Sequence, residues 1–189
     1  RWAAGILGKA GKKITQRDME LLLTKTGTDM GNLRMEMEKL ISYTEGRDVV
    51  TAEDIEEICT TQTTNRIFDM VRAVTEKNQK RALELYYDLL TLKEPPMRIL
   101  FLLAKQYRQL LLAKQFAAAG LAQTEVASKL GVPGFVVRNI TTCARAYTIS
   151  ELEQAVKDFV DAEESVKTGR LEDKLSVELL IIKYSSKVK

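Results

Sequence analysis

The sequence predicts an all-α fold, and three observations support this prediction. Leu, Ala, Glu, Lys and Gln, which favour helices, dominate the composition. The chain has only three prolines, two of them adjacent at Pro95 and Pro96. No segment alternates apolar and polar residues over a length that would make a half-buried strand. With 189 residues, of which 45% are hydrophobic, the chain is long enough to bury a sizeable core.

Residues 1–62 are predicted to form a small, lid-like bundle of helices with short connections. Thr15 should cap the second of these helices, because a hydroxyl at that position can accept a hydrogen bond from the first helical turn. By the same reasoning Thr28 or Asp29 should cap the third helix and Thr51 the fourth. One face of the third helix should be apolar and hold Leu33, Met37, Leu40 and Thr44.

The polar stretch Thr60–Thr64 is the best candidate for a domain boundary, which we place between 1–62 and 63–189. The second domain is predicted to be a larger, collar-like helical bundle, and its first two helices are expected to form an antiparallel pair. Ser150, with Glu153 three residues later, should form a capping box. The expected helices span Arg66–Glu76, Gln79–Leu92, Pro95 to about Ala119, Thr124–Leu130, Pro133–Tyr147, Ser150–Lys167 and Leu171–Tyr184.

The long helix in the middle of this domain is apolar around most of its circumference, so it belongs at the centre of a bundle. Its one polar stripe holds Arg98, Lys105 and Gln109, flanked by Gln106 and Arg108. At about 100° per residue, these side chains point to one side of the helix. The stripe should therefore face water, a subunit partner or DNA.

Charge is distributed unevenly along the chain, although the net charge is only +3. Residues 93–145 contain eight basic residues against two acidic ones, Glu94 and Glu125. Such an excess attracts phosphate backbones, but it also occurs on a solvated surface that an acidic neighbour balances. Both interpretations stay open.

Several function classes are excluded or disfavoured. The chain has no histidine, which excludes His-based acid–base chemistry and His metal ligation. Cys59 and Cys143 are isolated, and we expect them to be small buried thiols in a reduced cytosol. An enzyme would need a carboxylate pair such as Glu163 and Glu164 in a cleft, but adjacent helical residues point in different directions. We therefore predict no catalytic residue, no cofactor, no metal and no membrane span.

A glycine-rich segment near the start of the chain hints at a phosphate-binding loop but does not fit one. Four residues separate the outer glycines of a P-loop, whereas Gly5 and Gly11 enclose five. A P-loop also has Ser or Thr after its lysine, whereas Lys13 follows Lys12. We expect no nucleotide binding at this segment.

The segment Asp161–Arg170 has a structural and a functional interpretation. Lys167 in the last turn of a helix and Gly169 as a left-handed cap are a complete structural account, which we favour. A tight turn that presents Lys167, Thr168 and Arg170 could also donate hydrogen bonds to a phosphate. The second interpretation stays open.

One pair of predicted helices in the second domain has the spacing of a helix-turn-helix motif. Its second helix offers Phe135, Val136 and Val137, and only Arg138 and Asn139 could hydrogen-bond to bases. We therefore favour a buried helical corner, in which the three apolar residues are buried. The alternative function is a helix-turn-helix DNA-binding regulator, in which they would be partly open.

The order and spacing of these features resemble the delta subunit of the bacterial DNA polymerase III clamp loader. No single motif is specific, but the resemblance covers nearly the whole chain. The segments that carry it are Thr28–Leu33, Glu36–Leu40, Val50–Ile55, Arg66–Met70, Tyr107–Leu111, Leu130–Pro133 and Val166–Gly169.

The resemblance implies an architecture and a role. Members of the family look like three-part AAA+-type proteins, in which an N-terminal domain opens the sliding clamp, a small helical lid follows, and a helical collar joins the subunits. The chain resembles the lid (1–62) and the collar (63–189), so clamp contact would belong to a first domain that is missing here. The delta subunit does not hydrolyse ATP, and nucleotide transfer belongs to another subunit of the holoenzyme.

We therefore expect a non-catalytic part of a cytoplasmic bacterial clamp loader that acts in DNA replication. Its partners would be the other clamp-loader subunits, through the collar, and primer-template DNA. The candidate DNA-facing residues are Arg98, Lys105, Arg108, Lys167, Thr168 and Arg170.

Overall fold

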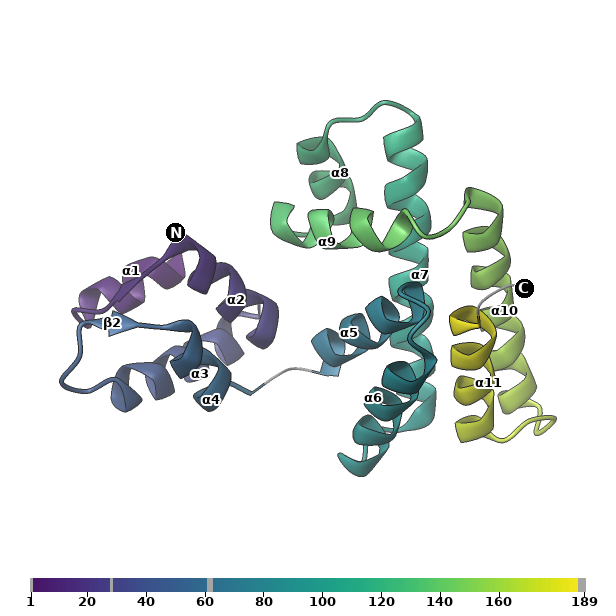
Figure 1. Cartoon of the computed structure of the whole chain (residues 1–189), viewed down its shortest axis with the longest axis horizontal. Helices are drawn as coiled ribbons and strands as arrows, with labels where there is room; N and C mark the ends of the chain where they lie inside the picture. The colour runs from purple at the N-terminus through teal and green to yellow at the C-terminus, as the bar shows by residue number, and fades with distance from the viewer. Residues whose placement is uncertain (1, 28, 61–62, 187–189) are drawn as a thin grey trace. The chain divides into compact units, whose positions relative to one another are not determined.

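In the computed structural model, the chain divides into two compact units, Arg1–Asn65 and Arg66–Lys189, which we call the N-terminal and C-terminal units. The structure describes residues 2–27, 29–60 and 63–186. The predicted domain boundary after residue 62 lies outside the described residues. Helices make up most of the described chain (Figure 1), which confirms the all-α prediction.

The described part of the N-terminal unit holds four short helices and one very short strand pairing. Strands β1 (Lys13–Ile14) and β2 (Val49–Val50) pair in parallel and tie the segment after the first helix to the segment before the fourth. Two residues per strand are too few to show apolar alternation, so sequence periodicity does not reveal them. The helices are α1 (Trp2–Lys9), α2 (Gln16–Thr26), α3 (Met30–Tyr43) and α4 (Ala52–Ile58).

Polar caps fix the starts of three of these helices. The Thr15 hydroxyl accepts a hydrogen bond from the third residue of α2 at 3.1 Å, as predicted. At the start of α3 the cap is Asp29, whose carboxylate accepts from a backbone N–H at 2.9 Å, while Thr28 lies outside the described residues. Thr51 caps α4 as predicted and forms a reciprocal capping box with Asp54.

The core of the N-terminal unit lies under α3. Glu36 is buried there beside the apolar residues, and its carboxylate pairs with Lys39 at 2.6 Å and accepts from the Thr60 N–H at 3.1 Å. These contacts compensate the carboxylate for lost hydration. The predicted inward face of α3 is confirmed, because Leu33, Met37, Leu40 and Thr44 are all buried.

The C-terminal unit is a larger bundle of helices arranged around α7 (Figure 1). The central helix packs against the four helices that follow it in the chain. This position agrees with its apolar circumference. The helices are α5 (Thr63–Thr75), α6 (Gln79–Thr91), α7 (Pro96–Ala118), α8 (Gln123–Leu130), α9 (Gly134–Ala144), α10 (Ile149–Lys167) and α11 (Asp173–Ser185).

A cluster of aromatic rings holds α7, α10 and α11 together. The Tyr107 ring lies 5.0 Å from Phe159 and 5.5 Å from Tyr184, measured between ring centroids. Its hydroxyl shares a 3.1 Å hydrogen bond with the Tyr147 hydroxyl. Burial raises the pKa of Tyr107 well above 10.0, so the ring stays neutral.

An ionic clamp joins α10 to α11. The Asp158 carboxylate accepts hydrogen bonds from the Lys183 ammonium at 2.6 Å, from the Gln154 amide at 3.0 Å and from the Tyr184 hydroxyl. Burial alone would raise the pKa of Asp158, but the hydrogen bonds from Lys183, Tyr184 and Gln154 outweigh it and lower that pKa below 3.8. Asp158 is therefore a charged, stabilising group in the folded chain.

Three expectations for the C-terminal unit were wrong in detail. The capping box of α10 uses Thr148 and Glu151 rather than Ser150 and Glu153, because the helix begins at Ile149 and therefore already contains Ser150. Helix α6 packs mainly against α11, not against α5 as an antiparallel partner. Gln106 does not flank an exposed stripe but is buried, only 7% exposed.

Candidate assembly and nucleic-acid surfaces

One side of α7 is uncovered and basic. Arg98, Lys105 and Arg108 are all exposed on this side, as the polar stripe predicts. Phe101 lies between them in the helical repeat and is 63% exposed, although a ring of that size is normally buried. We call these four residues the α7 face. An aromatic ring among cations is the combination that binds single-stranded nucleic acid, and it also occurs at protein interfaces.

The cations of the α7 face differ in how they are already engaged. Arg98 pairs with Glu94 at 3.1 Å. Within the described part of the chain, Lys105 and Arg108 have no ion pair. Because exposed pairs are worth little, Arg98 can exchange its partner for a phosphate at small cost. Lys105 and Arg108 need no such exchange.

Not all of the basic excess over residues 93–145 is surface charge. The Lys114 ammonium is half-buried and donates hydrogen bonds to the carbonyls of Ala144, at 2.9 Å, and Tyr147, at the end of α9. A cation at a helix C-terminus satisfies carbonyls that have no partner within the helix. Lys129 lies 5.7 Å from the centre of the Phe116 ring. Lys114 is therefore a structural residue rather than a candidate ligand contact.

The turn between α10 and α11 lies at the same end of the C-terminal unit as the start of α7 (Figure 1). Gly169 has a φ of 72°, which confirms the predicted left-handed cap. The Lys167 ammonium contacts Glu163 at 2.5 Å, and Arg170 donates to Glu164 at 3.1 Å and to the Thr168 hydroxyl at 3.0 Å. The cations of this turn are thus partly neutralised, which favours the structural interpretation.

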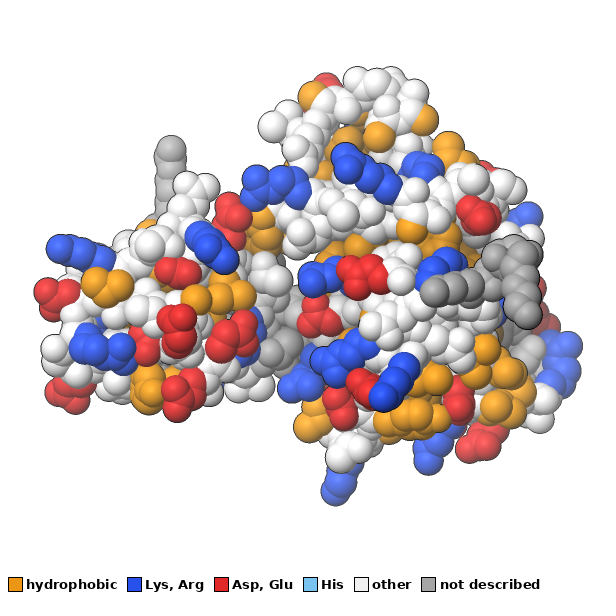
Figure 2. All heavy atoms as spheres, viewed as in Figure 1, with side chains coloured by type: hydrophobic (Ala, Val, Ile, Leu, Met, Phe, Trp, Pro, Cys, Tyr) orange, Lys and Arg blue, Asp and Glu red, His pale blue; other side chains and the backbone are white. Residues whose placement is uncertain are grey.

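A second exposed surface is apolar and lies on α6 and α11. Leu175 and Leu179 are 42% and 48% exposed and lie one turn apart on α11. Tyr87 of α6 is 47% exposed and donates a 2.7 Å hydrogen bond to Glu178 of α11. Figure 2 shows hydrophobic side chains gathered over these two helices. We call Tyr87, Leu175 and Leu179 the α6–α11 surface.

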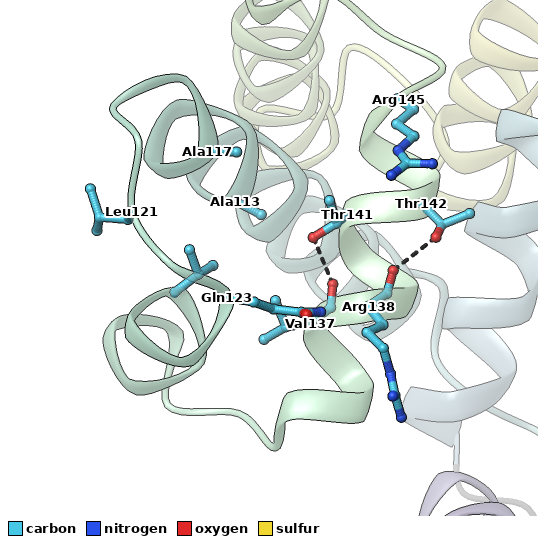
Figure 3. Close-up of a pocket in the computed structure, with 10 residues that line it drawn as sticks. Ala113, Ala117, Leu121, Gln123, Val137, Arg138, Thr141, Thr142 and Arg145 are labelled. Carbon is cyan, nitrogen blue, oxygen red and sulfur yellow. Dashed lines mark hydrogen bonds between the residues drawn. The ribbon is translucent and has the colours of Figure 1, made fainter.

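At the corner between α8 and α9 (Figure 3), the exposure of the three apolar residues agrees fully with neither the buried-corner interpretation nor the helix-turn-helix interpretation. Val137 is buried, whereas Phe135 and Val136 are half-buried. Arg138 and Asn139 are exposed. Val137 packs into the same core as α7, which anchors α9 in the bundle and leaves its first turn partly open.

The segments considered for chemistry have structural roles. Gly5 and Gly8 lie inside α1 rather than in a loop, and the Lys12 ammonium donates to the carbonyls of Thr44 and Arg47 at 2.7 and 2.6 Å. The described residues contain no cluster of carboxylates and thiols that could hold a metal ion. Within the same residues, no helix is long and apolar enough to cross a bilayer.

The sequence analysis did not single out the exposed apolar residues of the two surfaces. Phe101, Leu175 and Leu179 each fit the apolar pattern of a helix, and that pattern alone does not separate buried residues from exposed ones. The signal that could have identified them is that the apolar residues extend around most of the circumference of the helix. A helix that is apolar all round needs neighbours on every side, and one side of α7 and one side of α11 have none in the described chain.

Comparisons with known proteins agree on one family. Residues 64–184 match the family model described as DNA polymerase III delta subunit, C-terminal domain. The chain is 26% identical over 171 residues to DNA polymerase III subunit delta of Bacillus subtilis strain 168, covering 90% of this chain and 49% of that protein. It is 23% identical over 123 residues to the probable DNA polymerase III subunit delta of Aquifex aeolicus strain VF5, covering 65% and 35%.

The fold also matches a solved structure. The Bacillus subtilis DNA clamp loader delta protein superposes with a TM-score of 0.86 at 24% identity, over 98% of this chain and 55% of that one. The chain thus spans about half or less of the length of the curated relatives it matches. None of these relatives is described as a helix-turn-helix regulator, so that alternative has no support from them.

Proposed function

Because this chain belongs to the family of the DNA polymerase III delta subunit, whose C-terminal domain it contains, we propose that it is a non-catalytic assembly part of a bacterial clamp loader. In this proposal the C-terminal unit is the collar, which packs against other clamp-loader subunits in the cytoplasm. The N-terminal unit is the lid. Sliding-clamp contact belongs to a part of the relatives that this chain does not span.

The observation that carries the assembly role is the α6–α11 surface. Three large apolar side chains, each more than two-fifths exposed, lie together on two helices that pack against each other. Leaving such side chains in water costs about 25 cal/mol for each Å² that a partner would cover. Scattered exposed apolar residues are ordinary, but a contiguous group with a polar rim marks an interaction site. Glu178 supplies such a rim beside Tyr87.

Charge insertion on this surface tests the assembly role. The double variant Leu175→Glu, Leu179→Glu should no longer co-elute with the other clamp-loader subunits in size-exclusion chromatography. The control is Met30→Glu, Met35→Glu on α3, where the two methionines are 58% and 59% exposed. Both variants should keep the helical circular dichroism of the parent. Normal co-elution of the Leu175/Leu179 variant would refute the assembly role of this surface.

We also propose that the α7 face contacts primer-template DNA, with Lys105 and Arg108 as the main phosphate contacts. Arg98, Lys167, Thr168 and Arg170 are secondary candidates because the structure already gives them partners. Support comes from Lys105 and Arg108, which have no ion pair with any described residue and lie beside an exposed ring. In the assembled loader, the double variant Lys105→Glu, Arg108→Glu should weaken the salt dependence of binding to primed DNA. The negative slope of log K against log salt should become less steep by about 2. A slope equal to that of the parent would refute this contact.

A further inference from the structure

A buried carboxylate of the N-terminal unit holds the chain just after α4 ends. Glu36 of α3 is only 5% exposed, and its carboxylate accepts a hydrogen bond from the Thr60 N–H at 3.1 Å. Lys39 pairs with the same carboxylate oxygen at 2.6 Å. The Lys39 ammonium also donates to the Ile58 carbonyl and to the Thr60 hydroxyl, both at 3.4 Å. Ile58 and Thr60 are therefore both bound to one turn of α3.

A second contact holds the chain where α5 begins. The side-chain amide of Asn65, in the first turn of α5, donates a hydrogen bond to the Lys25 carbonyl at 2.8 Å. Lys25 lies at the end of α2, where carbonyl groups have no partner within the helix and can accept such a bond. Its ammonium donates to the Glu56 carbonyl at 2.5 Å and pairs with the Glu56 carboxylate at 2.8 Å. Lys25 therefore joins both α4 and the first turn of α5 to the end of α2.

Both contacts attach the chain to the same compact unit, which ends at Asn65. A segment turns freely between two bodies only when its ends are attached to different bodies. Thr60 and Asn65 are attached to one body, so a polar composition between them does not by itself make a free connection. The next residues of α5 serve the other unit, because Ile67 and Met70 are buried in its core. The change from one unit to the other therefore falls at the bond between Asn65 and Arg66.

We propose that the Glu36 carboxylate and the Lys25 carbonyl form a latch, which keeps Thr60 and Asn65 with the N-terminal unit and limits how far the two units turn against each other. While the latch is closed, the units turn only at the bonds that follow Asn65. When it opens, the chain from Thr60 onward becomes a longer tether, and the range of motion grows. The latch is a property of the single chain, so this inference goes beyond the proposed assembly role and does not depend on it.

Nuclear magnetic resonance of the whole chain tests the proposal, because nitrogen-15 relaxation gives a rotational correlation time for each unit. In the parent, the Thr60 and Asn65 amides should relax like the helices of the N-terminal unit. In Glu36→Ala and in Asn65→Ala, the correlation times of both units should fall, since each unit then tumbles more independently. In Glu36→Ala, the Thr60 amide should also exchange with deuterium at least about tenfold faster, as expected on losing a hydrogen bond to a charged group.

Two matched substitutions in the same unit serve as controls. Asn32→Ala removes an equivalent bond, because the Asn32 amide donates to the Thr26 carbonyl at 2.8 Å, and it leaves Thr60 and Asn65 attached. Glu38→Ala removes a neighbouring carboxylate of α3, which is exposed and pairs with Arg34 at 3.0 Å. Both controls should keep the correlation times of the parent.

Three results would overturn the proposal. The first is correlation times in Glu36→Ala and Asn65→Ala that equal those of the parent. The second is an equal fall in the two controls, because the effect would then be a general loosening of the N-terminal unit. The third is a parent in which the Thr60 and Asn65 amides already relax differently from the N-terminal helices. If Glu36→Ala lost the dispersed amide signals of a folded unit, Asn65→Ala, at a half-buried residue, would still decide the question.

Discussion

Replacing Lys114 by methionine, in comparison with the same substitution at Lys105, tests whether Lys114 stabilises the fold and does not bind DNA. The Lys114 ammonium satisfies two carbonyls at the end of α9, and Lys114→Met would leave both without that donor. A hydrogen bond from a charged group contributes about 1.5–3 kcal/mol, and the helix dipole adds about 0.3–1 kcal/mol. Allowing for partial access of water to this half-buried group, we expect the free energy of unfolding to fall by about 2–4 kcal/mol.

Urea unfolding followed by far-ultraviolet circular dichroism measures this change. The control is Lys105→Met, the same substitution on the same helix at an exposed residue, which should change the free energy of unfolding by less than about 0.5 kcal/mol. In DNA binding the larger effect should come from the other substitution. Lys105→Met should make the salt dependence of binding less steep, and Lys114→Met should leave it unchanged. Equal destabilisation by the two substitutions would show that the contacts of Lys114 with α9 contribute nothing.

Three further experiments test local features. Thr148→Ala should lower the free energy of unfolding by about 1 kcal/mol, because Thr148 is the cap of α10. Ser150→Ala should change it very little. If urea unfolding gave the reverse order, Ser150 would be the cap, as the sequence predicted. Asp158→Asn should cost about 1–2 kcal/mol near neutral pH. Because the pKa of Asp158 is lowered in the folded chain, its contribution is present above pH 3.8 and is lost as acid protonates it, so parent and variant should converge in unfolding experiments at lower pH. Gly169→Ala should lower the melting temperature, because a φ of 72° costs a residue with a side chain about 1 kcal/mol. The added methyl group would have no atom within 4 Å, so the effect comes from the backbone alone. An unchanged melting temperature would argue against a left-handed cap.

The sequence predicted helices well because their signals are local. Thr15 and Thr51 cap the helices that follow them because the capping bond joins residues only three apart, so no tertiary information is needed. Near the start of α10 two segments satisfy the same spacing. Thr148 is used rather than Ser150, because α10 begins at Ile149 and contains Ser150, a two-residue difference in helix start that the spacing alone does not specify.

Exposure was harder to predict than helicity. Gln106 lies at the edge of the polar stripe by helical angle, yet neighbouring helices bury it. Its side-chain amide oxygen has no hydrogen-bond partner among the described residues. Phe101 is the opposite case, an apolar residue that no described helix covers. Both outcomes depend on how α8 to α11 are placed around α7, which periodicity along one helix cannot specify.

The candidate DNA-facing residues were only partly separable from sequence. Composition identified the basic excess over residues 93–145, but not that Lys114 is committed to the end of α9. The turn at Gly169 was predicted in conformation, whereas the ion pairs of Lys167 and Arg170 depend on side-chain positions. Long, flexible cations on a helix can reach several partners, so sequence spacing does not fix which one they choose.

Hydroxyl-radical footprinting with mass spectrometry tests the central claim most directly, because it reports which side chains lose solvent when a partner binds. The chain would be labelled alone and after mixing with the other clamp-loader subunits. We predict that labelling of Tyr87, Leu175 and Leu179 falls severalfold on mixing, while labelling of Met30 stays constant. Equal labelling of the α6–α11 surface in both samples would contradict the claim that this helical surface holds a neighbouring subunit.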